Sequence, residues 1–313
     1  MTRLRRVGVI AAVTAALALT ASPALAAPPP VPSGDQLVAM SCFSDAPLDL
    51  FVVDPATGTS TEIASAGFDG CGYAAAWDTQ TMRLYVVEYY TGDLLAYDPA
   101  TATFATVGPI ADSGSTLIET YAFAIDPDGN AFGIDPDGNL YSIDLATGLA
   151  TLLGDLVDLD LYTYGFSADP VTGTLYALSE SGTLYEIDPD LVTATAVDTW
   201  PFPGDGDDAW GLAIDSAGTA WVVQNPGEDD AYAGLWSTPL ATFGDTTEFC
   251  CNLVDPATGV AYDGWWVAVM PAIYPPQLAN TGVDAAPLVA GGLGLLAVGA
   301  LVVVAAARRS RRA

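Results

Sequence analysis

The residues best suited to bind a metal ion lie in two loops of identical sequence. Residues 126–130 and 135–139 both read Asp-Pro-Asp-Gly-Asn. Calcium takes about six to eight oxygen ligands, often from closely spaced Asp and Asn side chains. The predicted calcium ligands are Asp126, Asp128, Asn130, Asp135, Asp137 and Asn139. The alternative is two plain hairpin turns, because Asp-Gly commonly forms them and the distant glutamate of a complete calcium loop is missing.

Few residues in this chain could perform catalysis. The sequence has no His and no Lys, which excludes imidazole metal sites, Ser-His-Asp triads and Schiff bases. Carboxylates remain, and a glycoside hydrolase needs only two of them, about 5–9.5 Å apart. The chain has seven Glu residues, and no pair of them stands out. We therefore predict a binding protein without catalytic residues, and the alternative is a carboxylate-dependent enzyme that acts on glycans.

Aromatic residues offer a second kind of binding surface. Tyr89-Tyr90, Trp200, Trp210 and Trp265-Trp266 could form a platform on which sugar rings stack. The alternative is that these large rings are buried between β-sheets, where they contribute mainly to the core. The sequence alone leaves both interpretations open.

These loops and rings belong to a repeated β pattern. Four segments have an alternating strand, an Asp and a turn, at 50–58, 95–101, 140–148 and 184–189. Their aspartates, Asp54, Asp98, Asp144 and Asp188, are 44, 46 and 44 residues apart. A second series of aspartates alternates with the first, at Asp78, Asp126, Asp169, Asp215 and Asp255. About four short strands in 40–50 residues are typical of a propeller blade.

We therefore predict an all-β fold, a β-propeller over residues 36–270. Four blades are predicted at 72–108, 120–154, 164–198 and 209–247. A fifth blade would close the ring with outer strands from 36–66 and inner strands from 249–270, and a six-bladed ring is the alternative. The repeats resemble those of quinoprotein-like and NHL-like propellers. This resemblance implies a fold rather than an activity.

Four cysteines are candidates for disulfides: Cys42, Cys71, Cys250 and Cys251. An even number of cysteines in an exported chain favours disulfides, and four cysteines allow three pairings. A bridge between the adjacent Cys250 and Cys251 would be strained, so we expect each to reach a partner in the N-terminal part. A bridge from Cys42 to this pair would lock the closing blade and contribute about 2–4 kcal/mol.

The N-terminus predicts export. Residues 1–26 combine a basic start, an apolar stretch at 7–19 and a small-residue cleavage site, Ala24-Leu25-Ala26. These are the three parts of a secretory signal peptide, with cleavage expected after Ala26. Pro-rich spacers at 27–35 and 271–277 flank the predicted propeller domain.

The C-terminal tail also has three parts in a fixed order. Residues 278–282 read Leu-Ala-Asn-Thr-Gly, 285–307 are 23 apolar residues without charge, and 308–313 contain four Arg. As a helix the apolar run is about 34 Å long, which is enough to cross a hydrocarbon core of about 30 Å. The arginines should hold its end in the cytoplasm.

This tail resembles the cell-wall sorting signal of Gram-positive surface proteins, in the Leu-Ala-x-Thr-Gly variant that class E-like sortases of actinobacteria read. The resemblance implies that the recognition motif is Leu278, Ala279, Asn280, Thr281 and Gly282. A sortase would cut between Thr281 and Gly282 and join Thr281 to peptidoglycan. The expected location is outside the cell, covalently attached to the wall, with the precursor held in the plasma membrane. The alternative is an ordinary C-terminal membrane anchor.

The charge of the chain limits its partners. Residues 27–281 contain one Arg and 37 Asp or Glu residues, a net charge of 1 − 37 = −36. Nucleic acid is excluded, since binding it needs basic contacts to phosphate, whereas cations are favoured. The absence of Lys excludes polymerisation into a sortase-built pilus. We expect a surface protein that binds an extracellular protein, glycan or cation, and the alternative is a structural wall component without a specific ligand.

Overall fold

The computed structural model describes residues 35–56, 59–157, 159, 162–200, 208–225, 234–245, 248–252 and 266–270. These residues form strands β1 to β19 and one short 3-10 helix, η1 (Leu240–Thr242). The predicted all-β class is therefore confirmed. Within the described ranges, no helix is long and apolar enough to cross a membrane. The predicted signal peptide, the predicted sorting motif at 278–282 and the apolar segment 285–307 lie outside these ranges.

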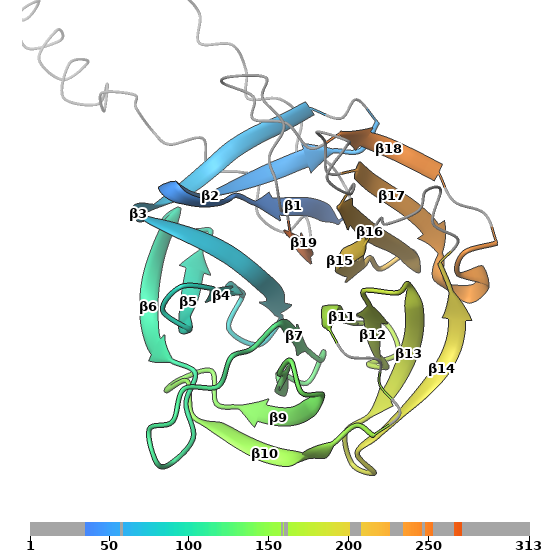
Figure 1. Ribbon diagram of the computed structural model, residues 1–313. Helices are drawn as coiled ribbons and strands as arrows, with labels where there is room; N and C mark the ends of the chain where they lie inside the picture. The colour runs from blue at the N-terminus through green and yellow to red at the C-terminus, as the bar shows by residue number, and fades with distance from the viewer. Residues whose placement is uncertain are drawn as a thin grey trace, which may run out of the picture. The chain divides into compact units, whose positions relative to one another are not determined.

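Three four-stranded antiparallel sheets follow one another along the chain (Figure 1). The first contains β7 (Ala122–Ile125), β8 (Ala131–Ile134), β9 (Asn139–Ile143) and β10 (Ala150–Asp155). The second contains β11 (Thr163–Ala168), β12 (Leu175–Ser179), β13 (Thr183–Asp188) and β14 (Thr193–Thr199). The third contains β15 (Asp208–Ile214), β16 (Thr219–Asn225), β17 (Gly234–Pro239) and β18 (Glu248–Asn252).

The remaining strands form a seven-stranded sheet in the order β19-β1-β2-β3-β4-β5-β6. The long strand β3 (Thr59–Asp78) joins its two halves, which we describe as two sheets. Its first part pairs with β2 (Cys42–Asp54), and its second part, from Gly72 onward, pairs with β4 (Arg83–Glu88). The sheet of β4 is completed by β5 (Asp93–Asp98) and β6 (Thr103–Pro109). The sheet of β2 is completed by β1 (Gln36–Met40) and β19 (Trp266–Met270), because β1 pairs with both β2 and β19.

The predicted segments coincide with these sheets except near the C-terminus. The sheet that begins at β15 is longer than predicted, because β18 pairs with β17 and places Cys251 opposite Leu235. Residues 249–252 therefore do not join the N-terminal strands, and that part of the prediction is wrong. Among the described residues, the C-terminal part contributes β19 to the sheet of β1 and β2.

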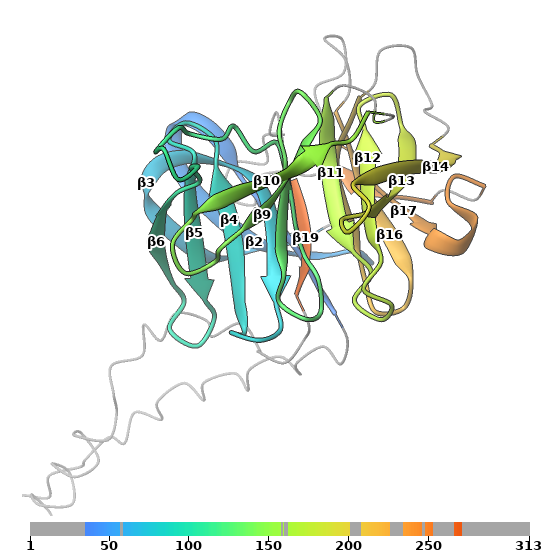
Figure 2. The same cartoon turned by 90° about the horizontal axis from the view of Figure 1, so that it is seen from below.

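One strand of each sheet lies innermost, as Figures 1 and 2 show. These inner strands are β3, β7, β11, β15 and β19. Going along the chain, each inner strand contacts the next, and β19 contacts β3. Small residues permit this close approach: a Cβ added at Gly165 in β11 would lie only 2.8 Å from the Cβ of Leu212 in β15.

Apolar side chains fill the space between neighbouring sheets. Between the sheets of β7 and β11, Ile134 and Leu140 pack with Phe166 and Ala177. All four side chains are buried. Burial of a Leu, Ile or Phe side chain contributes about 1.5–3 kcal/mol. These contacts hold the inner strands at fixed positions, and therefore also the residues at the ends of those strands.

Candidate functional site

Aromatic residues occupy equivalent positions in or beside four inner strands. Tyr73, Tyr164 and Trp210 lie within β3, β11 and β15, and Tyr121 directly precedes β7. Each precedes by five residues an aspartate at or just after the end of the strand, and the pairs are Tyr73 and Asp78, Tyr121 and Asp126, Tyr164 and Asp169, Trp210 and Asp215. This equal spacing places the four rings near one end of the inner strands and the four aspartates near the other. The end with the rings is the candidate site.

The rings at this end contact one another. The ring centroids of Tyr73 and Tyr121 are 5.1 Å apart, and those of Tyr121 and Tyr164 are 5.5 Å apart. Tyr164 lies 6.1 Å from Tyr73 and 6.2 Å from Trp210. Ring pairs at about 4.5–7 Å attract each other beyond the effect of burial alone. Rings from β3, β11 and β15 and from the residue that precedes β7 thus form one continuous group.

Three further tyrosines, which are more exposed than the first four residues, extend this group. Tyr89 stacks on Tyr73 with centroids 4.7 Å apart, and Tyr90 lies 5.3 Å from Tyr89. Tyr162 lies 6.5 Å from Tyr164. Their side chains are 42% (Tyr89), 54% (Tyr90) and 50% (Tyr162) exposed. We call the seven residues the aromatic cluster: Tyr73, Tyr89, Tyr90, Tyr121, Tyr162, Tyr164 and Trp210.

The hydroxyl groups of Tyr73 and Tyr121 are neutral. Burial raises the pKa of Tyr73 above its ordinary value. Burial also raises the pKa of Tyr121, and the hydrogen bond that the Tyr121 hydroxyl donates to Glu119 Oε1 (3.0 Å) adds to this effect. A phenol with a raised pKa stays protonated at physiological pH. The cluster therefore presents uncharged ring faces and hydroxyl groups.

Glu88 is a buried carboxylate beside the cluster. It ends β4 directly before Tyr89, and it is 1% exposed. Its Oε1 accepts a hydrogen bond from the Cys71 backbone N–H (3.1 Å). Its Oε2 accepts hydrogen bonds from the backbone N–H (2.7 Å) and the hydroxyl (2.8 Å) of Thr91. These three hydrogen bonds hold the Glu88 side chain in one position.

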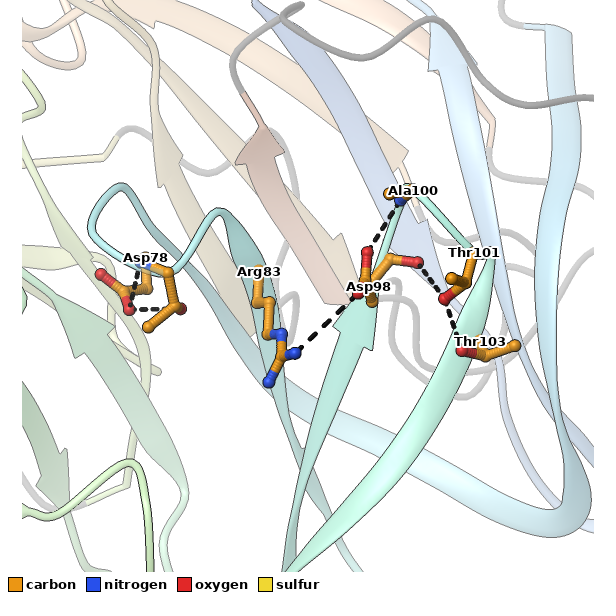
Figure 3. Close-up of polar contacts among 7 residues, drawn as sticks. Asp78, Arg83, Asp98, Ala100, Thr101 and Thr103 are labelled. Carbon is orange, nitrogen blue, oxygen red and sulfur yellow. Dashed lines mark hydrogen bonds and ion pairs between the residues drawn. The ribbon is translucent and has the colours of Figure 1, made fainter.

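The basic residue nearest in sequence to the cluster lies at the far end of the same strand. Arg83 begins β4, whereas Glu88 ends it. Figure 3 shows that the Arg83 guanidinium points toward Asp98 in β5, and the closest N–O distance is 3.9 Å. Arg83 is the single basic residue between residues 27 and 281. The aromatic cluster therefore combines ring faces and carboxylates, while the one cation of this region is engaged elsewhere.

The two loops that suggested calcium are hydrogen-bonded turns. Asp126 Oδ1 accepts hydrogen bonds from the backbone N–H groups of Asp128 (2.9 Å) and Asn130 (2.8 Å). Asp126 Oδ2 accepts one from the Asn130 side-chain amide at 2.8 Å. Gly129 has a φ of +88°, a backbone conformation that L-residues rarely adopt. This geometry is the one expected for a plain hairpin turn.

The second loop repeats the first. Asp135 accepts hydrogen bonds from the backbone N–H groups of Asp137 and Asn139 and from the Asn139 amide. It also accepts one from the Tyr141 hydroxyl at 3.1 Å. In the part of the chain that the structure describes, no three His, Cys, Asp or Glu side chains are grouped so that they could hold a metal. Calcium binding at the two loops stays a prediction.

The aromatic residues singled out in the sequence have different positions. Tyr89, Tyr90 and Trp210 belong to the aromatic cluster. Trp200 is 2% exposed and packs against Trp236 and Phe243, so it is a core residue and not part of a platform. Trp266 lies opposite Met40 in the β1–β19 pair, and Trp265 lies outside the described residues.

Four cluster residues were missed in the sequence: Tyr73, Tyr121, Tyr162 and Tyr164. Three of them share the five-residue spacing to the strand-end aspartate, which could have revealed them. Tyr162 has no such signal. Its φ of +63° is unusual for a bulky residue, and the Glu180 N–H donates to its carbonyl oxygen at 2.9 Å.

The opposite end of the inner strands holds a narrow cavity of about 80 Å³. Small side chains line it, among them Ala75, Ala76, Ser167 and Ala213. A larger groove of about 1050 Å³ is lined by residues that include Arg83, Asp128 and Asn130. The aromatic cluster differs from both spaces because it presents exposed ring faces, and it is therefore the candidate that we consider further.

The fold divides the four candidate disulfide residues into two pairs. Cys42 of β2 lies directly opposite Cys71 of β3, and the Cys71 side chain is fully buried. Cys250 and Cys251 lie in β18, which belongs to another sheet. The strand register thus brings together Cys42 and Cys71. The predicted sorting residues lie outside the described ranges: Leu278, Ala279, Asn280, Thr281 and Gly282.

Comparisons with known proteins support the fold. A chain from a crystal structure of a nidogen/laminin complex matches 75% of this chain and 98% of its own length, at 12% identity and a TM-score of 0.50. A protein of unknown function from Bacteroides thetaiotaomicron matches 77% of this chain and 64% of its own length, at 15% identity and a TM-score of 0.51. No protein-family model and no curated protein matches. At these identities the likeness shows the fold alone, which is propeller-like and repetitive.

Proposed function

We propose that the chain is a secreted, wall-anchored β-propeller that binds an extracellular ligand on its aromatic cluster. The single observation that carries the binding function is the cluster itself. Rings from β3, β11 and β15 and from the residue that precedes β7 converge there, and Tyr89, Tyr90 and Tyr162 keep their rings exposed. Exposed tyrosines at the end of a rigid framework are common in binding sites, because they offer large contact area at low cost in side-chain entropy.

The propeller would have five blades. The contacts of the inner strands support this number, since they run from β3 through β7, β11 and β15 to β19 and then return to β3. The pairing of β1 with β19 supports closure by strands from both ends of the domain. In this arrangement the fifth blade consists of β19, β1, β2 and the first part of β3.

The anchoring part of the proposal depends on the tail. The order of pentapeptide, apolar run and arginines supports attachment to peptidoglycan by a sortase at Thr281. The test is Thr281→Ala, followed by fractionation of the cells. We expect the variant to move from the wall fraction to the membrane fraction, whereas an unchanged amount in the wall would refute the sorting proposal.

The binding part is tested with a panel of soluble glycans, amines and peptidoglycan fragments. Ligand-observed NMR would compare the full chain with the double variant Tyr90→Ser/Tyr162→Ser. A ligand of the cluster should give a signal with the natural chain and lose it with the variant. Ligands that bind equally to both proteins would place the binding site elsewhere.

An enzyme that acts on glycans is the alternative. The observation in its favour is that two carboxylates, Glu88 and Glu119, lie beside the cluster. Glycan turnover that is lost in Glu119→Gln, with binding retained, would support the enzyme. Absence of turnover on every wall and plant glycan tested would leave binding as the function.

A further inference from the structure

We infer that the ligand of the aromatic cluster is an organic cation, a substituted ammonium group. The inference rests on the proposed binding function and adds the chemistry of the ligand. Three properties of the described residues favour a cation over a neutral sugar: the exposed ring faces, the carboxylates around them and the absence of a nearby basic residue.

The ring faces attract positive charge. The face of an aromatic ring carries partial negative charge, so an ammonium group within about 6 Å of the ring centroid is attracted to it. Tyr89 and Tyr90 lie next to each other at one part of the cluster, and Tyr162 lies beside Tyr164 at another. A substituted ammonium group can place its carbon atoms against these rings while its charge remains close to the ring faces.

Two carboxylates lie beside the same rings. Glu119 Oε1 accepts the hydrogen bond of the Tyr121 hydroxyl. Glu88 directly precedes Tyr89 in the chain and is 1% exposed.

The field of the whole domain has the same sign. With a net charge of 1 − 37 = −36 between residues 27 and 281, the domain attracts cations over a distance of about one Debye length. The single Arg of this region pairs with Asp98 at the other end of β4 and cannot supply a positive charge to the cluster. Stacking of a neutral sugar needs only the rings, so it would make no use of this charge.

A metal ion is a less suitable occupant than an organic cation. Calcium requires about six to eight oxygen ligands. No group of three acidic side chains that could hold a metal is found among the described residues. An ammonium group that carries carbon substituents needs ring faces and a diffuse negative potential, which this surface provides.

The experiment compares two ligands of the same shape. Choline and its neutral carbon analogue, 3,3-dimethylbutan-1-ol, would be titrated into the full chain in a non-ionic detergent by calorimetry. A cation–π contribution of about 0.5–2 kcal/mol corresponds to about 2–30-fold tighter binding of choline. Tyr162→Leu keeps an apolar side chain without a ring and should weaken choline binding about two- to fivefold.

A matched pair of charge variants tests the carboxylates. Glu119→Gln should weaken choline binding, whereas Glu186→Gln, an exposed glutamate of β13 away from the cluster, should leave it unchanged. Equal affinity for choline and its neutral analogue would overturn the inference, as would choline binding that is insensitive to Tyr162→Leu. A sugar that binds in a Tyr162-dependent manner while choline does not bind would overturn the cation but leave the proposed binding function intact.

Discussion

Gln36 and Met270 lie opposite each other in the antiparallel pair of β1 and β19. They come from the first and the last strands that the structure describes, so this ladder joins the two ends of the domain. Its side chains also pack against a neighbouring sheet. Leu37, which lies opposite Val269, packs into a cluster that includes Val223 of β16 and Leu235 of β17. The first and last described strands are therefore part of the core.

Leu37→Ala tests whether this closure stabilises the whole domain. Leu37 is 5% exposed, and removal of a buried Leu side chain costs about 2–5 kcal/mol. We expect urea unfolding to show a loss of this size in the free energy of unfolding. The control is Leu152→Ala in β10, where the side chain is 56% exposed and the loss should be within about 0.5 kcal/mol. Equal effects of the two substitutions would mean that β1 lies outside the cooperative unit.

The sequence was sufficient to predict most of the sheets because most strands are short, alternating and bounded by turn residues. The sequence did not predict the position of β18. Its Cys250-Cys251 pair was assigned to a disulfide with the N-terminal part, whereas β18 pairs with the preceding strand β17. The sequence also missed most of the aromatic cluster. Tyr73 and Tyr121 are nearly 50 residues apart in the chain, and they meet only because neighbouring sheets place their inner strands together. Such contacts depend on the packing of sheets, which the periodicity of one strand does not reveal.

Cys42 and Cys71 should form a disulfide. Residues directly opposite each other in an antiparallel pair have Cβ atoms about 4.5–5.5 Å apart, close to the separation that a disulfide needs. Peptide mapping under non-reducing conditions should recover a fragment that links the two cysteines. A fragment that links Cys42 to Cys250 or Cys251 would instead support the bridge expected from the sequence.

The same bridge should stabilise the domain. The double variant Cys42→Ser/Cys71→Ser should lose about 2–4 kcal/mol of unfolding free energy. The matched control is Cys250→Ser/Cys251→Ser, whose residues lie in β18 of a different sheet. Similar stability of the Cys42→Ser/Cys71→Ser variant and the natural chain would argue against a stabilising bridge at this position.

Substitutions of Asp135 and Asp137 can distinguish a plain turn from a calcium site, because the two interpretations assign these residues different roles. In the turn, Asp135 accepts four hydrogen bonds, from two backbone N–H groups, the Asn139 amide and the Tyr141 hydroxyl. Asp135→Ala should therefore cost about 1–3 kcal/mol, whereas Asp137→Ala, in which an exposed side chain is removed, should cost little. Thermal melts of both variants would measure the difference.

Calcium titration completes this test. A ligand at 100 times its dissociation constant adds about 2.7 kcal/mol of stability, which shifts the melting temperature by several degrees. In a calcium site, both aspartates would be ligands, so each substitution should abolish the shift. With the hydrogen bonds of Asp135 already made, we expect melts in calcium and in EDTA to coincide at matched ionic strength. A saturable shift that both variants lose would establish the metal site.

Tyr97 should make the domain less stable at alkaline pH. Burial, and secondly the negative charge of Asp98, raise the pKa of Tyr97 to about 12. An unfolded tyrosine ionises near pH 10, so the folded state holds the proton more tightly. The stabilising contribution is complete below about pH 10 and is lost as the pH rises toward 12. At pH 11 the loss is on the order of 1 kcal/mol for this residue.

The measurement is the urea unfolding midpoint at pH 8, 9.5 and 11 for the natural chain and for Tyr97→Phe. The variant has no phenol to ionise at this position, so its stability should fall less steeply with pH. Some pH dependence should remain, because burial and Asp135 also raise the pKa of Tyr141 to about 12. Parallel pH profiles for the two proteins would show that Tyr97 ionises equally in the folded and unfolded states, contrary to its burial between β4 and β6.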